Sequence, residues 1–205
     1  RDSSTSRGLG DVYKRQVGEM TAEVFHKGMG SIAERNYRPH ITCARITPDG
    51  KFLTASDVGL DQVKLYGFDA KTGAIKLVDI LRCELESSPR SMIFSPDGRF
   101  AYLICQLKNC VNVYTYNSDD GMPHFEMIQQ ISTLGKSYND KSAVAAIKQS
   151  VDGKYIFCSN AGDNSIAFFV RDEKTGMLTK NCVLPISGDL SLIHISEPTR
   201  RRGIS

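Results

Sequence analysis

The chain has 205 residues, a formal net charge of +3 and a pI near 8.5. Its two ends, residues 1–16 and 190–205, hold seven of the basic and three of the acidic residues, so residues 17–189 carry 19 basic and 20 acidic side chains. The interior is therefore nearly neutral, and it has no basic stripe with interleaved aromatic residues. The basic pI thus gives no evidence that the protein binds nucleic acid.

The two ends of the chain are related to each other through their possible codons. Residues 11–16 can be written GAT GTG TAT AAG AGA CAG, and the reverse complement of that string encodes residues 190–195. The match extends outward over sixteen consecutive codons and resembles translated adapter from sequencing-library preparation. Since folding gives no reason for such complementarity, we expect residues 1–16 and 190–205 to be disordered adapter-derived ends and exclude them from the fold.

A short turn recurs three times in the rest of the chain, with Asp-to-Asp spacings of 48 and 55 residues. A second glycine follows each turn glycine by 23 residues. The turns are Pro48-Asp49-Gly50, Pro96-Asp97-Gly98 and Val151-Asp152-Gly153, and the second glycines are Gly73, Gly121 and Gly176. A fixed internal spacing within a variable outer period indicates one folded module whose connecting loops differ in length.

Each module contains apolar runs that predict β-strands. β-Branched and aromatic residues recur at every second position between Gly, Asp and Asn residues, as in 63–68, 111–116 and 166–170. Four antiparallel strands every 48 to 55 residues are typical of a β-propeller blade. The predicted fold class is therefore all-β: a β-propeller fragment of about three four-stranded antiparallel blades plus part of another.

In chain order, residues 17–37 are predicted to form the last strand of a preceding blade and the connection to the next. The first complete blade then has strands at 41–47, 52–56, 63–68 and 74–80. Arg90 opens the second blade at the place where His40 opens the first. The third blade opens near residues 140–143, and Ser142 stands where the second blade has its arginine.

Strand direction decides which polar side chains can meet. In an antiparallel meander, the start of the first strand and the end of the second lie at the same end of the sheet. If the first strand of each blade lines the central axis, five polar residues converge at one mouth of the channel, and the Pro-Asp-Gly turns face the other end. These residues are His40, Asp57, Arg90, Gln106 and Asn160. Loops on a rigid scaffold commonly carry binding groups, so this mouth is the predicted site.

Several motifs occur in a defined order along residues 17–189. They are Arg38-Pro39-His40, Ser-Asp-Val-Gly-Leu-Asp-Gln-Val at 56–63, Pro89-Arg90, the Pro-Asp-Gly turns, and the Asp-x-x-Thr-Gly turns at Asp69 and Asp172. This set resembles the lactonase family of seven-bladed β-propellers, which includes the propeller-type 6-phosphogluconolactonases and fungal muconate lactonising enzymes. The resemblance implies a seven-bladed parent, of which this chain is a fragment cut at both ends.

The resemblance also implies site residues. The Pro-His motif of the family is kept at His40, and its Pro-Arg-His motif is kept as Arg90, with Ser91 in place of the histidine. Where the family has Asn-Glu-Leu, this chain has Cys105-Gln106-Leu107, and a later family arginine would lie beyond Asp189. His40 is the expected acceptor of the proton of an attacking water, and Arg90 the expected partner of an anionic oxygen. The amide of Gln106 can orient a water but cannot act as a base.

Each of these residues also has a structural role open to it. His40 can cap a strand start by bonding a backbone carbonyl, and Arg90 can pair with an acid of a neighbouring blade. Asp57 and Asn160 can shape turns by bonding their own backbone, and Gln106 can fix the geometry of its loop.

The resemblance leaves two functions open. The first is hydrolysis of a phosphorylated sugar lactone, 6-phosphogluconolactone to 6-phosphogluconate, in the pentose phosphate route. The second is a non-catalytic propeller that binds a ligand or a protein partner, which Ser91 and Gln106 favour. The fragment itself is expected to be inactive, because an open arc lacks half of the channel and exposes strand edges. We expect no nucleic-acid or membrane partner, and the sequence leaves the oligomeric state open.

The six cysteines show no paired two-residue spacing, so neither a zinc site nor a redox pair is indicated. Most lie within or beside predicted strands, where a free thiol behaves as a small apolar group. We expect no metal and no cofactor. No apolar run reaches the about 18 residues of a membrane helix, which favours a cytoplasmic protein. His26 and His124 are expected at the surface.

Overall fold

The computed structural model describes residues 19–30, 38–136, 138 and 140–186. The predicted adapter-derived ends, 1–16 and 190–205, lie outside the described residues. The strands are β1 (Ile41–Ile46), β2 (Phe52–Asp57), β3 (Gln62–Phe68), β4 (Ile75–Arg82), β5 (Pro89–Phe94), β6 (Phe100–Cys105), β7 (Cys110–Asn117), β8 (His124–Ser132), β9 (Ala143–Gln149), β10 (Tyr155–Ala161), β11 (Ser165–Arg171) and β12 (Leu178–Pro185). None of the described residues forms a helix that could span a membrane.

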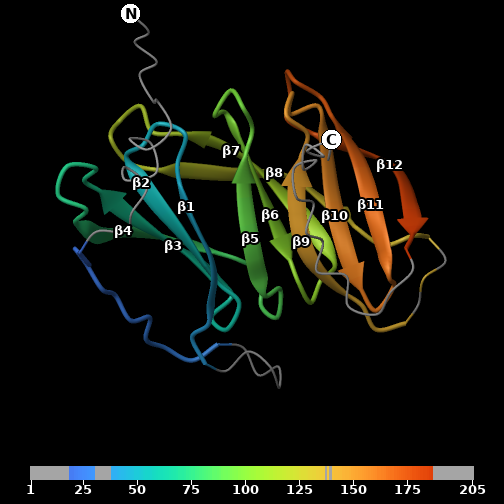
Figure 1. The fold of residues 1–205 in the computed structure, drawn as a ribbon, viewed down its shortest axis with the longest axis horizontal. Coiled ribbons are helices and arrows are strands. Elements are labelled where there is room, and N and C mark those ends of the chain that lie inside the picture. Colours follow the sequence, from blue (N-terminus) through green and yellow to red (C-terminus); the bar gives the residue numbers. More distant parts are fainter. Residues whose placement is uncertain (1–18, 31–37, 137, 139, 187–205) are drawn as a thin grey trace, which may run out of the picture.

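The strands form three separate antiparallel sheets of four, each in chain order: β1 to β4, β5 to β8 and β9 to β12. We call these sheets blades 1, 2 and 3. They stand side by side, and the first strand of each blade contacts the first strand of the next, β1 with β5 and β5 with β9 (Figure 1). The predicted all-β fold with three complete four-stranded blades is therefore confirmed.

The three Asp-Gly turns between first and second strands are built in the same way. The residue before each turn carries a hydroxyl, and this oxygen accepts the backbone N–H of the residue five positions later at 3.0 Å. The pairs are Thr47 with Phe52, Ser95 with Phe100, and Ser150 with Tyr155. The turn aspartate accepts a second backbone N–H, and the turn glycine has a positive φ of 67 to 73°. The local sequence thus specifies the same turn in each of the three hairpins.

These turns gather at one end of the blades. A Cβ placed on Gly98 would lie 2.9 Å from Pro48 of the preceding turn, and one on Gly153 would lie 2.3 Å from Pro96. The first strands of the blades therefore run in the same direction, and their starting ends lie together at the opposite end. This is the arrangement predicted for the mouth and for the turns.

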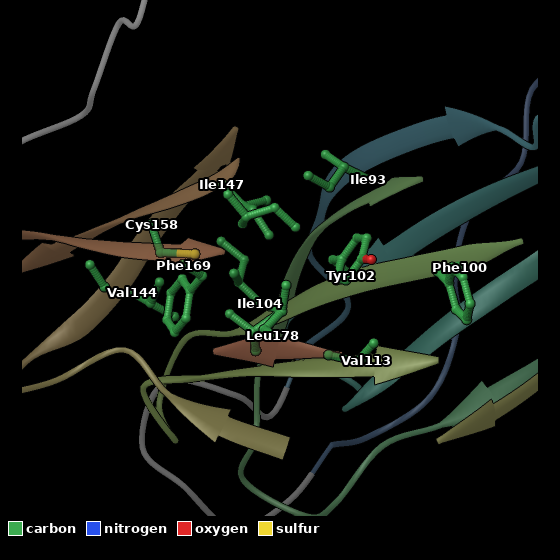
Figure 2. Packing of buried hydrophobic residues seen from close by; sticks show 13 residues of the cluster. Ile93, Phe100, Tyr102, Ile104, Val113, Val144, Ile147, Cys158, Phe169 and Leu178 are labelled. Carbon is green, nitrogen blue, oxygen red and sulfur yellow. The ribbon is translucent and has the colours of Figure 1, made fainter. Parts of the chain in front are cut away.

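The blades are joined by apolar side chains buried between them. One cluster packs Ile104 and Val113 of blade 2 against Val144, Ile147 and Phe169 of blade 3, all at most 3% exposed (Figure 2). A second cluster joins blades 1 and 2 and includes Val63, Leu65, Met92 and Leu103. Because a fully buried aliphatic or aromatic side chain contributes about 1.5–3 kcal/mol, contacts between blades hold the arc together.

One predicted element is wrong: residues 19–30, within the expected strand and connection at 17–37, contain no strand. An extended segment becomes a strand only when a neighbouring strand takes its hydrogen bonds, and none of the described strands pairs with this one. The segment instead lies against blade 1, and the Thr21 hydroxyl donates to the carbonyl of Gly73 in that blade at 3.3 Å. The expected part of a further blade is thus not found among the described residues.

Candidate functional site

The first strands carry one unpaired residue each near their starting ends. The register between first and second strands shifts by one residue in every blade, and the extra residues are Thr42, Arg90 and Ala145. Such β-bulges redirect a side chain and are common beside active sites. The three bulges form a hydrogen-bonded row: the Thr42 hydroxyl donates to the Arg90 carbonyl at 2.6 Å, and Arg90 Nε donates to the Ala145 carbonyl at 2.8 Å.

This register corrects two predicted equivalences. The His40 carbonyl accepts the N–H of Val58, and the Ser88 carbonyl accepts the N–H of Gln106, so His40 corresponds to Ser88. Arg90 therefore corresponds to Thr42, and Ala145 rather than Ser142 holds its place in blade 3. The spacing to the recurring turn agrees with this register, because Thr42, Arg90 and Ala145 each precede the aspartate of their turn by seven residues, whereas His40 precedes its aspartate by nine.

The structure brings Arg90 and Gln106 together. Arg90 Nη1 donates to Gln106 Oε1 at 2.8 Å, and both residues are half-buried. Two of the five N–H groups of a guanidinium are used in the bonds to Gln106 and Ala145. The remaining donors have the forked geometry that suits a carboxylate or phosphate oxygen. The amide of Gln106 thus holds Arg90 in place, where a glutamate would neutralise its charge.

Asp57 is completely buried and organises the start of blade 1. Its Oδ1 accepts the backbone N–H of His40 at 2.8 Å and that of Gly59 at 3.0 Å. His40 itself is exposed, and no hydrogen bond of its imidazole is found within the described part of the chain. Asp57 therefore fixes the backbone beneath a histidine whose ring is open to solvent, which is the turn-shaping role left open by the sequence.

The expected surface position of His26 is wrong. Its side chain is only 2% exposed, and its Nδ1 lies 2.5 Å from Asp57 Oδ2. Its Nε2 lies 2.9 Å from the hydroxyl of Tyr66, whose pKa is raised by burial and next by the charge of Asp57. The phenol therefore keeps its proton and can donate to Nε2, while Nδ1 donates to the carboxylate. His124 is exposed, as predicted, and pairs with Asp120.

Asn160 occupies in blade 3 the position that Asp57 has in blade 1. Its Nδ2 donates to the Thr133 carbonyl and to the Ser165 hydroxyl, each at 3.0 Å, and its side chain is fully buried. Asn160 thus ties the end of blade 2 to blade 3. The predicted site residues therefore divide into exposed or half-buried ones, His40, Arg90 and Gln106, and the buried anchors Asp57 and Asn160.

A hollow of about 250 Å³ lies further along the first strands, outside this group. Arg45, Ile93, Phe94, Lys148 and Gln149 line it, and it includes none of the five predicted site residues. Within the described residues, no group of three or more His, Cys, Asp or Glu side chains could hold a metal ion. The starting ends of the first strands of blades 1 and 2 thus carry an exposed imidazole, at His40, and a half-buried guanidinium, at Arg90.

The chain is similar in sequence and in structure to several known proteins. A 6-phosphogluconolactonase of Bacillus subtilis is 32% identical over 157 residues, which cover 77% of this chain and 44% of that protein. A crystal structure of a protein from Lactobacillus plantarum has a TM-score of 0.73 at 31% identity, over 81% of this chain and 47% of the other. The structure of a periplasmic gluconolactonase of Pseudomonas aeruginosa has a TM-score of 0.71 at 27% identity, over 78% and 44%.

The chain spans about half the length of the curated relatives that it matches, for example 46% of two proteins of Lactococcus lactis. The family model described as "Lactonase, 7-bladed beta-propeller" matches residues 11–190. Three four-stranded blades with contacting first strands are what part of such a ring contains. The chain therefore belongs to the lactonase family of seven-bladed β-propellers.

Proposed function

We propose that the intact protein hydrolyses a sugar lactone, and that its substrate is 6-phosphogluconolactone. The observation that carries this proposal is the guanidinium of Arg90, which stands on a bulge of β5 at the same end of the blades as the exposed imidazole of His40. Lactone hydrolysis needs a group that takes a proton from water and positive charge for the oxyanion. The name of the relative from Bacillus subtilis supports the phosphorylated substrate.

In the proposed mechanism, water attacks the lactone carbonyl while His40 takes its proton. Arg90 holds either the developing oxyanion or the phosphate with the donors that Gln106 and Ala145 leave available. Asp57 sets the position of His40 through the backbone, and Gln106 sets that of Arg90. Because a phosphorylated sugar carries charge and does not cross a membrane unaided, the proposal places the protein in the cytoplasm.

The proposal is tested with His40→Ala and Arg90→Ala in the intact protein. Each change is expected to lower kcat/KM for 6-phosphogluconolactone by about 100-fold, because His40→Ala removes the group that takes the proton of the attacking water and Arg90→Ala removes the group that holds an anionic oxygen. His124→Ala and Arg82→Ala are matched controls, since both side chains are exposed on outer strands, and they should leave the rate unchanged. Full activity of both test variants would contradict the proposed roles.

A comparison of substrates separates the two roles of Arg90. If Arg90 holds the phosphate, Arg90→Ala raises KM for 6-phosphogluconolactone and leaves the hydrolysis of unphosphorylated gluconolactone unchanged. If it holds the oxyanion, kcat falls for both lactones. The assay subtracts spontaneous lactone opening, which is measured at the same pH without protein.

A non-catalytic propeller is the second candidate. Two observations favour it. The guanidinium of Arg90 is bonded to the amide of Gln106, at a position where the family has a carboxylate. Ser91 also stands where the family has a histidine. In that case the intact protein would not exceed the spontaneous rate of lactone opening. A sugar phosphate would still raise its unfolding temperature by binding to the folded state.

We further propose that the 205-residue chain is inactive by itself, and that residues 17–189 form its propeller part. Three blades supply only an arc of the channel wall, so a lactone bound near His40 and Arg90 is open to water on the other side. The expected result is lactone hydrolysis at the spontaneous rate in the presence of the chain. A rate above that background, removed by Arg90→Ala, would show that the arc is sufficient.

A further inference from the structure

Two buried thiols face each other at the hairpin between β6 and β7. Cys105 ends β6, Cys110 begins β7, and the two residues are direct partners in the antiparallel ladder. Residues directly opposite in such a ladder have Cα atoms about 4.5–5.5 Å apart. A disulfide spans Cα separations of about 4.4–6.8 Å, and the typical separation of a directly opposite pair lies within this range.

The side chains lie on the same face of the sheet. Asn112 Nδ2 lies 3.5 Å from the sulfur of Cys105, and the sulfur of Cys110 lies 3.7 Å from Asn112 Oδ1, so one amide touches both sulfur atoms. Both thiols belong to the apolar cluster between blades 1 and 2. A single neighbour within contact distance of both sulfurs places the two thiols beside each other.

The two thiols are chemically unequal. A hydrogen bond with the Cys105 thiol lowers the pKa of Cys110, and this effect outweighs burial and the charge of Glu84, which both raise it; the charge of Lys108 lowers it further. The same hydrogen bond, together with burial, raises the pKa of Cys105. A more acidic thiol beside a less acidic one is the arrangement of a reacting cysteine with a second cysteine that resolves its oxidised form.

Of the two cysteines, only Cys110 has any surface exposed to solvent. The side chain of Cys105 is completely buried, whereas Cys110 is 4% exposed. Between them lies the loop 106–109, in which Lys108 is exposed and its two predecessors are half-exposed. Local opening of such a loop admits a small oxidant such as a hydroperoxide more readily than a large one.

We propose that Cys105 and Cys110 form a dithiol that a hydroperoxide oxidises to a disulfide across the β6–β7 hairpin. The Cys110 thiolate attacks the peroxide oxygen, the O–O bond breaks, and sulfenic acid and hydroxide form. The Cys105 sulfur then attacks the sulfur of Cys110, its proton goes to the departing hydroxide, and the S–S bond forms. Two thiols and one hydrogen peroxide become one disulfide and two waters.

The bond would act on the candidate site. The ring that it closes contains Gln106, whose side chain holds the guanidinium of Arg90. Oxidation is expected to restrict the loop 106–109 and, with it, the hydrogen bond between Arg90 and Gln106. The disulfide itself does not depend on the proposed lactonase activity, so the two can fail separately.

The experiment treats the purified chain with hydrogen peroxide, blocks free thiols with iodoacetamide in denaturant and digests it with trypsin without reduction. Lys108 lies between the two cysteines, so cleavage there gives peptides 100–108 and 109–136. The expected result is one species that joins these two peptides, with a mass two hydrogens lower than their sum, which separates on reduction. Full alkylation of both cysteines, or sulfinic acid at Cys110 without the joined species, would overturn the proposal.

Variants identify the partners. Cys105→Ser is expected to abolish the joined species and to leave a sulfenic acid at Cys110 that dimedone traps. Cys182→Ser, at a half-exposed cysteine on β12, is the matched control and should form the joined species as the unchanged chain does. Cys83 lies near both thiols, so a disulfide that contains Cys83 in place of either partner would also overturn the proposal.

Discussion

Gly176→Ala is expected to destabilise the chain by about 3 kcal/mol. Gly176 has a φ of +73°, and a Cβ there would lie 2.2 Å from the ring of Phe100 in the neighbouring blade. The left-handed backbone costs an alanine about 1–2 kcal/mol, and forcing a methyl into a packed core costs about 1–3 kcal/mol more. The ring cannot move away easily, because Phe100 is only 5% exposed within the cluster between blades 2 and 3.

Gly121→Ala is the matched control for this prediction. Gly121 lies in the corresponding turn of blade 2 with a φ of +85°, but nothing lies within 4 Å of its added Cβ. Gly121→Ala should lower the free energy of unfolding only by the cost of the left-handed backbone, about 1 kcal/mol. Urea unfolding, followed by circular dichroism, gives both values from the shift in midpoint at constant slope. Equal losses for the two variants would show that contact between the blades does not limit the space at Gly176.

Asp57→Ala should destabilise blade 1 by about 3 kcal/mol. The change leaves the backbone N–H groups of His40 and Gly59 and the ring of His26 without their shared acceptor. A buried donor left unsatisfied costs about 1–3 kcal/mol. In the intact protein the same variant is expected to lower lactonase activity, because the backbone that carries His40 is no longer held.

Asp57→Asn separates hydrogen bonding from charge at this position. The amide keeps one oxygen for the two backbone donors, so most of the stability should remain, about 1 kcal/mol below that of the unchanged chain. The free energy of unfolding in urea measures both variants. If alanine is tolerated as well as asparagine, the buried carboxylate is not the anchor of the His40 backbone.

The repeat, the strands and the direction of the blades could be predicted because they depend on local chemistry. A hydroxyl, an aspartate and a glycine at fixed spacing close each turn, and alternating apolar residues define the strands between them. The same geometry placed His40 and Arg90 correctly at the starting ends of β1 and β5. Which of the five site residues act on a substrate stays a prediction.

Two features of the site could not be predicted. The bulge at Arg90 depends on how β5 pairs with β6, and spacing along one strand does not reveal an extra unpaired residue. The burial of His26 depends on a segment without strand periodicity that crosses blade 1, where Asp57 and Tyr66 take both ring nitrogens. A single histidine in such a segment carries no local signal of its partners, which come from residues 31 and 40 positions away.

The connection between blades 2 and 3 is pinned at both ends by asparagine side chains. Asn160 holds the carbonyl of Thr133, and Asn109 Nδ2 holds that of Ser142 at 2.9 Å. These two clamps hold both ends of the connection in place, in addition to the apolar cluster between the blades. A change in the number of residues between Thr133 and Ser142 is therefore expected to leave the packing of blade 2 against blade 3 in place.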